Sequence, residues 1–401
     1  MMSRRQTWIM LMALFVAAVA APLNQYKVPP VMPVLMDVFG LDLTSANLLM
    51  SVFAVAGLAL AIPAGLIVQR IGPKRSGLIA ITSVIVGSAL GALSSGTAML
   101  LASRAIEGLC FVLMMVVAPA LIAVWFTAEE RGVPMGIFAI WVPAGSMIML
   151  NLAPALVAQF GWQSVWWFGC AYGVMAFLLF WGLVKIPRRG SRGAHTASLG
   201  SEARPAGPPS MAMLGRALVN RDVWLLGLVF FTFTMCFPGF MTNMPTFLHT
   251  VRGYPLATAG FIVSLSALVN FISCPVAGWI SDRIGSRKLV YTVAYLILAV
   301  LWIFPFRLTG AGIPLFMIVF GLFAPVIPTM VMTSVPEIME RPELAGIGMG
   351  GVVALQNVGL LLGPVMFGRI VQVTGDWQLA GYALIPFCLL GVLFGLMVRV
   401  R

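Results

Sequence analysis

The stretch of sequence that decides the fold occurs twice. It reads GLIVQRIGPKR at Gly65–Arg75 and GWISDRIGSRK at Gly278–Lys288, so the copies begin 213 positions apart. Both copies keep two glycines and three basic residues in register, but Gln69 stands where the later copy has Asp282. A second match, GWQSVWW at 161–167 and GDWQLAG at 375–381, has nearly the same spacing. The chain therefore consists of two related halves.

The composition indicates a membrane protein. Of 401 residues, 61% are hydrophobic and 9% charged, against about 25% charged in an ordinary soluble domain. A run of about 20 apolar residues can cross a bilayer as a helix. Twelve such runs predict an all-α membrane protein with two bundles of six transmembrane helices: 7–36, 46–69, 76–96, 98–126, 133–158, 162–185, 223–248, 257–281, 288–306, 311–335, 344–372 and 378–398.

The expected domains are an N-terminal bundle at 1–185, a cytoplasmic linker at 186–222 and a C-terminal bundle at 223–401. The linker is rich in Arg, Gly, Ser, Ala and Pro, and its stretch 211–219 is either an amphipathic surface helix or disordered chain. The first residues also resemble a secretory signal peptide. We interpret them as the first span, because removing them would break the six-plus-six arrangement.

Charge and cysteine usage narrow the location and the partners. If the N-terminus is cytoplasmic, 19 of the 24 Lys and Arg residues lie on the cytoplasmic side, as the positive-inside rule requires. We therefore expect an inner-membrane protein with cytoplasmic N- and C-termini, and the net charge of +12 indicates topology rather than nucleic-acid binding. The five cysteines lie in apolar spans without paired spacing, so no disulfide or metal site is expected.

The repeated stretch resembles a signature of the major facilitator superfamily, found in the loops after the second and eighth spans. The second copy matches it throughout, and the first copy departs from it at Gln69 and Pro73. LLASRAIEGLC, which contains Arg104, is similar to the family's pattern in the fourth span. The resemblance covers the whole chain. It implies the fold and transport as the activity, but it does not imply a substrate.

In that family the signature loops help to latch the two bundles together on the cytoplasmic side in the outward-open state. A carboxylate there accepts hydrogen bonds from a helix N-terminus and pairs with arginine. Gln69 lacks that charge, so we expect a weaker latch and a bias toward the inward-open state. The latch residues implied by the resemblance are Gly65, Gln69, Arg70, Gly72, Gly278, Asp282, Arg283, Gly285 and Arg287.

Three charged residues lie inside spans and away from the cytoplasmic and outer helix ends that hold the other charges; ionisable groups there are costly and functional by default. Lys27 lies 19 residues after Trp8, or about 29 Å of helix, which places it at a depth similar to that of Arg104. Glu107 is three residues after Arg104 and can pair with it, which would leave Lys27 uncompensated and suited to an anion. The alternatives are that Lys27 extends to the outer interface and that the Arg104–Glu107 pair is purely structural.

These residues lead to a substrate-site prediction. The resembled fold surrounds its central cavity with spans one, four, seven and ten. We predict that the substrate is bound by Lys27, Tyr26, Arg104, Asn243, Asn270 and Asn357, and that Glu107 carries a coupling proton. Each neutral polar residue is also compatible with a plain interhelical contact.

The leading interpretation is a secondary transporter that moves a small, carboxylate-type anion across the cytoplasmic membrane by alternating access, with proton coupling or as a uniporter. The alternative is proton-antiport efflux of hydrophobic drugs, although WVPAGSMIMLNLAPAL matches the family's antiporter motif in the fifth span poorly. A non-transporting sensor stays open. No phosphate-binding loop, HExxH pair or nucleophile elbow occurs, so we expect no enzyme activity and no cofactor. The expected partners are the substrate and the lipid bilayer, with the protein a monomer.

Overall fold

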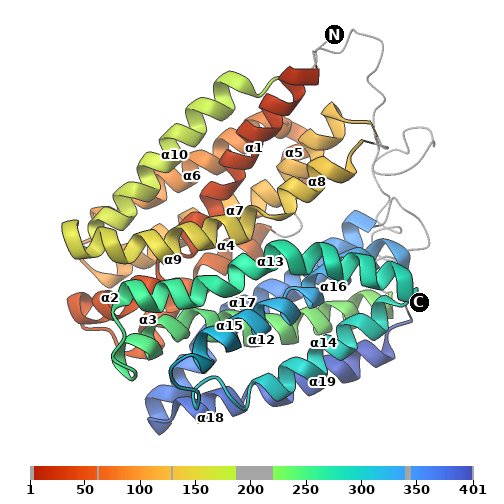
Figure 1. The fold of residues 1–401 in the computed structure, drawn as a ribbon. Helices are drawn as coiled ribbons and strands as arrows, with labels where there is room; N and C mark the ends of the chain where they lie inside the picture. The colour runs from red at the N-terminus through yellow and green to blue at the C-terminus, as the bar shows by residue number, and fades with distance from the viewer. Residues whose placement is uncertain (1–3, 61–62, 128–129, 187–219, 339–344, 400–401) are drawn as a thin grey trace.

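The computed structural model describes residues 4–60, 63–127, 130–186, 220–338 and 345–399. Within these ranges the chain forms helices arranged in two groups that follow one another in sequence (Figure 1). Most of the expected linker, including its stretch 211–219, lies outside the described residues.

The first group extends to Leu183. Several of its spans are made of shorter helices laid end to end. Its elements are α1 (Arg4–Gln25), η1 (Pro29–Val31), α2 (Met32–Phe39), α3 (Leu43–Ser51), α4 (Phe53–Leu60), α5 (Pro63–Ile71), α6 (Pro73–Ala92), α7 (Thr97–Trp125), α8 (Gly132–Ala139), α9 (Trp141–Phe160) and α10 (Gln163–Leu183).

The second group begins at Arg221 and repeats this pattern of long and divided spans. Its elements are α12 (Arg221–Thr250), α13 (Leu256–Ile284), α14 (Arg287–Leu301), α15 (Gly312–Phe323), α16 (Val326–Ile338), α17 (Ala345–Thr374), α18 (Trp377–Tyr382) and α19 (Ile385–Met397).

Eleven of the described helical segments are long and apolar enough to cross a membrane. The predicted span 288–306 differs, because α14 has only 15 residues and turns follow it. Pro305 lies four residues beyond the end of α14, and a proline restricts the residue before it to non-helical conformations. The prediction was therefore right about a helix at this place and wrong about its length.

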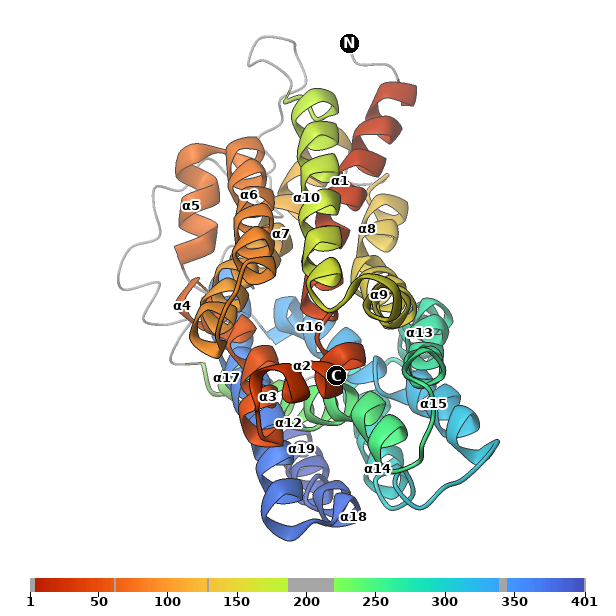
Figure 2. The same ribbon diagram turned by 90° about the vertical axis from the view of Figure 1, so that its left-hand side faces the viewer.

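The two groups pack most extensively along two pairs of spans, and η1 of the first group also touches α12 of the second. In Figure 2, α3 and α4 lie beside α17, and α9 lies beside α13. These packings bring the groups together at the end of the molecule that carries α2 and α3, here called the α2–α3 end; the opposite end, with the start of α1 and the end of α19, is called the terminal end (Figure 1). At the α9–α13 contact, Gly260 faces the carbonyl of Leu150 so closely that a Cβ would not fit. Small residues permit such close approach of membrane helices.

Candidate functional site: a buried charge cluster and a contact between the halves

A proline-rich break in the first span positions Lys27. α1 ends at Gln25, and the 3-10 turn Pro29–Val31 follows before α2 begins. In a continuous helix the Gln25 carbonyl would accept a hydrogen bond from the N–H of residue 29, but proline has no N–H. The helix therefore stops, and Lys27 lies in the break with its side chain wholly buried.

Lys27 is held by three polar side chains and one ring. Its Nζ lies 2.5 Å from Glu107 Oε1 and donates hydrogen bonds to Asn24 Oδ1 at 3.0 Å and to Ser88 Oγ at 3.2 Å. The ammonium also lies 4.7 Å from the centre of the Trp166 ring, a cation–π distance. The ammonium has three donor hydrogens, and three acceptors surround it.

Arg104 joins three spans through backbone carbonyls. Its NH1 and NH2 groups donate to the carbonyls of Asn24 at 2.6 Å and Gln25 at 3.0 Å, and its Nε donates to the Leu49 carbonyl of α3 at 3.0 Å. The Gln25 carbonyl is one of the acceptors that the proline break leaves without a helical donor. Arg104 therefore stabilises the broken end of α1 and fixes it to α3 and α7.

Glu107 connects the two cations. Its Oε2 lies 2.5 Å from Arg104 NH1, and its Oε1 also accepts a hydrogen bond from Ser88 Oγ at 2.8 Å. The predicted Arg104–Glu107 pair is therefore present. The expectation that Lys27 has no compensating charge is wrong, because the break in α1 turns Lys27 toward the same carboxylate. We call Lys27, Arg104 and Glu107 the charge cluster; it contains two cations and one carboxylate, all 0% exposed.

Sequence reasoning missed two members of this network. Asn24 Oδ1 accepts from Lys27 and lies 2.8 Å from Ser88 Oγ, whose single hydrogen serves either Asn24 or Glu107, and the Asn24 amide donates to the Ala20 carbonyl. Ser88 of α6 touches both Lys27 and Glu107. Polar residues inside apolar spans are the available signal, and both residues carry it.

The three asparagines of the predicted substrate site have partners outside the charge cluster. Tyr26 adjoins Lys27 in the break and is half-buried. Asn270 of α13 has its side-chain amide nitrogen turned toward the carbonyls of Gly321 and Ser266 and donates to both. Asn270 therefore bonds within the second group of helices. Asn357 of α17 donates to the Val353 carbonyl of its own helix. Its side chain also lies against Gly57 of α4, so Asn357 reaches the first group while Asn270 does not.

Asn243 belongs to a contact between the two halves. Its side-chain amide and that of Asn47 in α3 exchange two hydrogen bonds of 2.9 and 2.8 Å, and both side chains are 0% exposed. Closer to the surface, Gln372 of α17 bonds Asp42 Oδ2 at 2.7 Å and also bonds the Thr44 hydroxyl. We call Asp42, Thr44, Asn47, Asn243 and Gln372 the clasp. It ties the halves together at the α2–α3 end.

Asp42 makes the clasp sensitive to acid. The backbone N–H and hydroxyl of Ser45, together with Gln372, hold the pKa of Asp42 below its ordinary value, because these bonds favour the ionised carboxylate. Stability from a lowered pKa is complete above the unfolded value, about 3.9, and is lost as the pH falls through the lowered pKa. We therefore expect wild type to be more heat-stable than Asp42→Asn at pH 6 and this difference to shrink as the pH falls below about 3.9. A difference that stays constant with pH would show that the carboxylate charge does not matter.

The signature loops lie at the terminal end. Gly72 and Gly285 have φ values of 85° and 70°, a region that glycine adopts without strain. Gln69 and Asp282 are exposed. The described ion pair of these loops, Arg287 to Glu337 at 2.7 Å, stays inside the second half. The two halves are thus hydrogen-bonded at the α2–α3 end, while the signature side chains at the terminal end face solvent or their own half.

Comparisons with known proteins agree with this architecture. The model of the Major Facilitator Superfamily matches residues 14–347. The chain belongs to the major facilitator superfamily. It is a multi-pass membrane protein with the twelve-helix fold of that family, and it is a transporter rather than an enzyme.

Individual relatives are distant in sequence. The chain is 23% identical over 392 residues to a probable sulfoacetate transporter, SauU, of Cupriavidus necator, a match that covers 94% of this chain and 88% of the relative. It is 24% identical over 371 residues to a probable galactarate/D-glucarate transporter, GudP, of Bacillus subtilis, covering 84% and 80%. A crystal structure of a bacterial homologue of the human lysosomal transporter Spinster, in an inward-facing and unoccupied conformation, superposes with a TM-score of 0.84 at 15% identity and covers 99% of this chain and 98% of that chain. At that identity the superposition establishes the fold alone.

Proposed function

We propose that this transporter carries a small organic anion of the carboxylate type across the cytoplasmic membrane by alternating access. The observation that carries the proposal is the charge cluster, which is buried and has one more cation than carboxylate. An excess positive charge in a membrane is costly unless a partner offsets it, and an anionic substrate is such a partner. The names of SauU and GudP support this reading, because sulfoacetate and glucarate are anions.

We assign Lys27 as the group that contacts the substrate and Arg104 as a residue that positions Lys27. Arg104 already donates to three backbone carbonyls and one carboxylate. Among the described residues, the hydrogen-bond partners of the Lys27 ammonium are all side chains, and Lys27 sits in the break of the first span. Because Lys27 is 0% exposed, the anion reaches it only after the Lys27–Glu107 contact opens.

Protonation of Glu107 would open that contact. A neutral carboxyl no longer offsets the ammonium, so Lys27 becomes free to bind an anion. The cluster has a net charge of +1 with Glu107 ionised, from two cations and one carboxylate. Adding one proton and one monoanion leaves this sum unchanged, so co-transport of both moves no extra charge through the apolar interior.

The two helical groups would serve as the moving parts. We propose that the domains are 1–185 and 223–401, joined by a linker at 186–222, and that they rock about the midplane site. The positive-inside distribution of Lys and Arg supports cytoplasmic termini and a location in a bacterial inner membrane. In this proposed orientation the clasp closes the outer side, as an inward-open state requires.

The test measures ligand-induced heat stability and then uptake. A ligand that binds the folded state raises its unfolding temperature, so purified protein is screened against mono- and dicarboxylates, sulfonates and hydrophobic cations. We expect an anion to stabilise wild type, and proteoliposomes with an acidic exterior to take up that anion until a protonophore dissipates the gradient. We expect Lys27→Gln to lose both effects.

The matched control is Lys185→Gln, which makes the same change at an exposed lysine and should behave as wild type. Equal anion stabilisation of Lys27→Gln would remove Lys27 from the site. Stabilisation of wild type by hydrophobic cations alone would favour drug efflux. Anion binding without uptake would indicate a sensor.

A further inference from the structure

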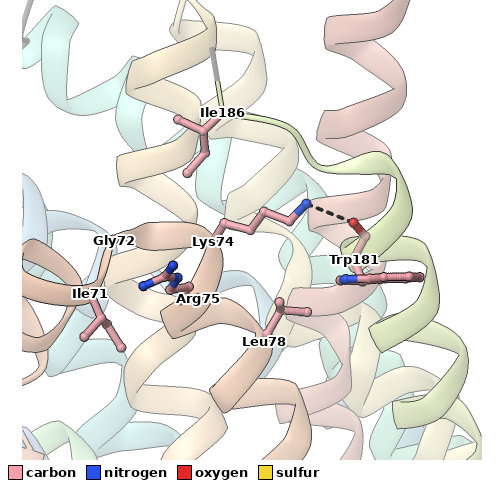
Figure 3. Close-up of a pocket in the computed structure, with 7 residues that line it drawn as sticks. All are labelled: Ile71, Gly72, Lys74, Arg75, Leu78, Trp181 and Ile186. Carbon is pink, nitrogen blue, oxygen red and sulfur yellow. Dashed lines mark hydrogen bonds between the residues drawn. The ribbon is translucent and has the colours of Figure 1, made fainter. Parts of the chain in front are cut away.

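A pocket of about 340 Å³ opens at the terminal end, between the start of α6 and the end of α10 (Figure 3). It lies away from the charge cluster and the clasp, and the transport proposal does not explain it. Its lining combines apolar and basic side chains: Ile71, Gly72, Lys74, Arg75, Leu78, Trp181 and Ile186.

The apolar part of the pocket lies where a membrane surface is expected. α6 begins at Pro73 and α10 ends at Leu183, and both helices are long and apolar enough to span a bilayer. Trp181 is 60% exposed and Ile186 is 42% exposed. Tryptophan is enriched at the level of the lipid headgroups. The pocket therefore sits at headgroup depth, with apolar side chains available to acyl chains.

The basic part of the pocket has donors to spare. Lys74 Nζ reaches across the pocket and donates to the Trp181 carbonyl at 2.9 Å, near the C-terminus of α10 (Figure 3). That bond uses one of three ammonium hydrogens. Arg75 is exposed, and the residues that line the pocket include no carboxylate. Two cations thus share a site without a lining acid.

At the equivalent place in the second half, one of the two cations is paired with an acid. Lys74 and Arg75 align with Arg287 and Lys288 in the repeated stretch. There Lys288 donates to the carbonyls of Leu396 and Val398 at the end of the chain's last helix, and Arg287 pairs with Glu337 at 2.7 Å. Both halves use one cation to cap their last helix, but only the second half supplies a described acid for the other cation.

We propose that the pocket binds the headgroup phosphate of an anionic phospholipid from the surrounding bilayer. Arg75 and Lys74 contact the phosphate, since guanidinium groups bind phosphate through paired hydrogen bonds, and an acyl chain lies along Trp181 and Ile186. Basic pockets between transmembrane helices are suited to such headgroups. The exposed apolar side chains of Trp181 and Ile186 favour a lipid. A soluble anion would leave these side chains in contact with water.

The experiment is native mass spectrometry of the purified full-length protein, titrated in detergent with phosphatidylglycerol and with phosphatidylcholine as the neutral probe. We expect one phosphatidylglycerol to bind with clear preference over phosphatidylcholine. Arg75→Gln should weaken its binding about fivefold, the value of one basic residue at a membrane surface. Lys74 and its cap on α10 stay in place in this variant, so the fold is preserved.

Two further variants test the site, and competition with inorganic phosphate tests the ligand. Arg70→Gln removes an exposed arginine of α5 that does not line the pocket and should bind as wild type, while Arg75→Lys should recover most of the affinity. Equal affinity of Arg75→Gln and wild type, or equal loss in Arg70→Gln, would overturn the proposal. Displacement of phosphatidylglycerol by millimolar inorganic phosphate would also overturn it, because the occupant would then be a soluble anion.

Discussion

Replacing Glu107 by Gln is expected to destabilise the protein by about 3–5 kcal/mol, the range for removing one partner of a buried ion pair. The variant leaves Lys27 and Arg104 as two like charges with 0% exposure. Lys27→Met should cost less, because the remaining Arg104–Glu107 pair is neutral. The charge cluster thus predicts an order of stability for three proteins: wild type, then Lys27→Met, then Glu107→Gln.

This order is measured by unfolding the purified proteins in detergent with heat or with denaturant. The double variant Lys27→Met/Glu107→Gln has one cation and no carboxylate, the same net charge as wild type, and should be more stable than Glu107→Gln alone. The matched control is Glu337→Gln, which breaks the exposed pair with Arg287 and should cost about 0–1 kcal/mol. If Glu107→Gln destabilised the protein no more than Glu337→Gln, the charge cluster would not be held by its ion pairs.

The second large effect concerns the clasp. Asn47→Ala removes two hydrogen bonds between the halves and leaves the buried amide of Asn243 without its partner. An unsatisfied buried polar group costs about 1–3 kcal/mol, and here the cost falls only on the conformation in which the α2–α3 end is closed. The population should therefore shift toward opening of that end by about 5–150-fold.

Distances between spin labels measure the shift. Val38 of α2 and Val373 of α17 are 53% and 65% exposed and belong to opposite halves at the α2–α3 end, so labels there report its opening. Asn151→Ala is the matched control, because Asn151 is exposed and, within the described part of the chain, its side chain bonds the Met147 carbonyl of its own helix. An unchanged distance distribution in Asn47→Ala would mean that the amide pair does not hold the halves together.

The same labels test the signature loop. Gln69→Asp restores the carboxylate that the second copy has at Asp282. If the charge strengthens the latch at the terminal end, this variant too should open the α2–α3 end, and its effect should add to that of Asn47→Ala. Absence of any shift would leave Gln69 without a conformational role.

The sequence predicted the fold because each part of the argument was local. The length of an apolar run, the repeat around Gly65 and Gly278, and the sign of loop charges need no knowledge of tertiary contacts. Depth along a helix was equally local, and it placed Lys27 near Arg104. The end of α14 at Leu301 was harder to predict, because apolar residues continue past the end of the helix.

The partners of the charged groups could not be predicted in this way. Helix spacing pairs Glu107 with Arg104 on one helix, but Lys27 reaches Glu107 only because the proline break changes the direction of its side chain. The Asn47–Asn243 pair joins residues 196 positions apart. It depends on how the two halves meet, which no local pattern encodes.

The arginine that holds the broken end of α1 also constrains how this sequence can evolve. Arg104 substitutes for the helical donor that Pro29 cannot supply to the Gln25 carbonyl, and it uses a planar fork that a lysine lacks. Arg104 therefore cannot be lost while Pro29 remains. A lineage that lost the arginine first would retain an unsatisfied helix end, so the proline must be replaced before the arginine becomes dispensable.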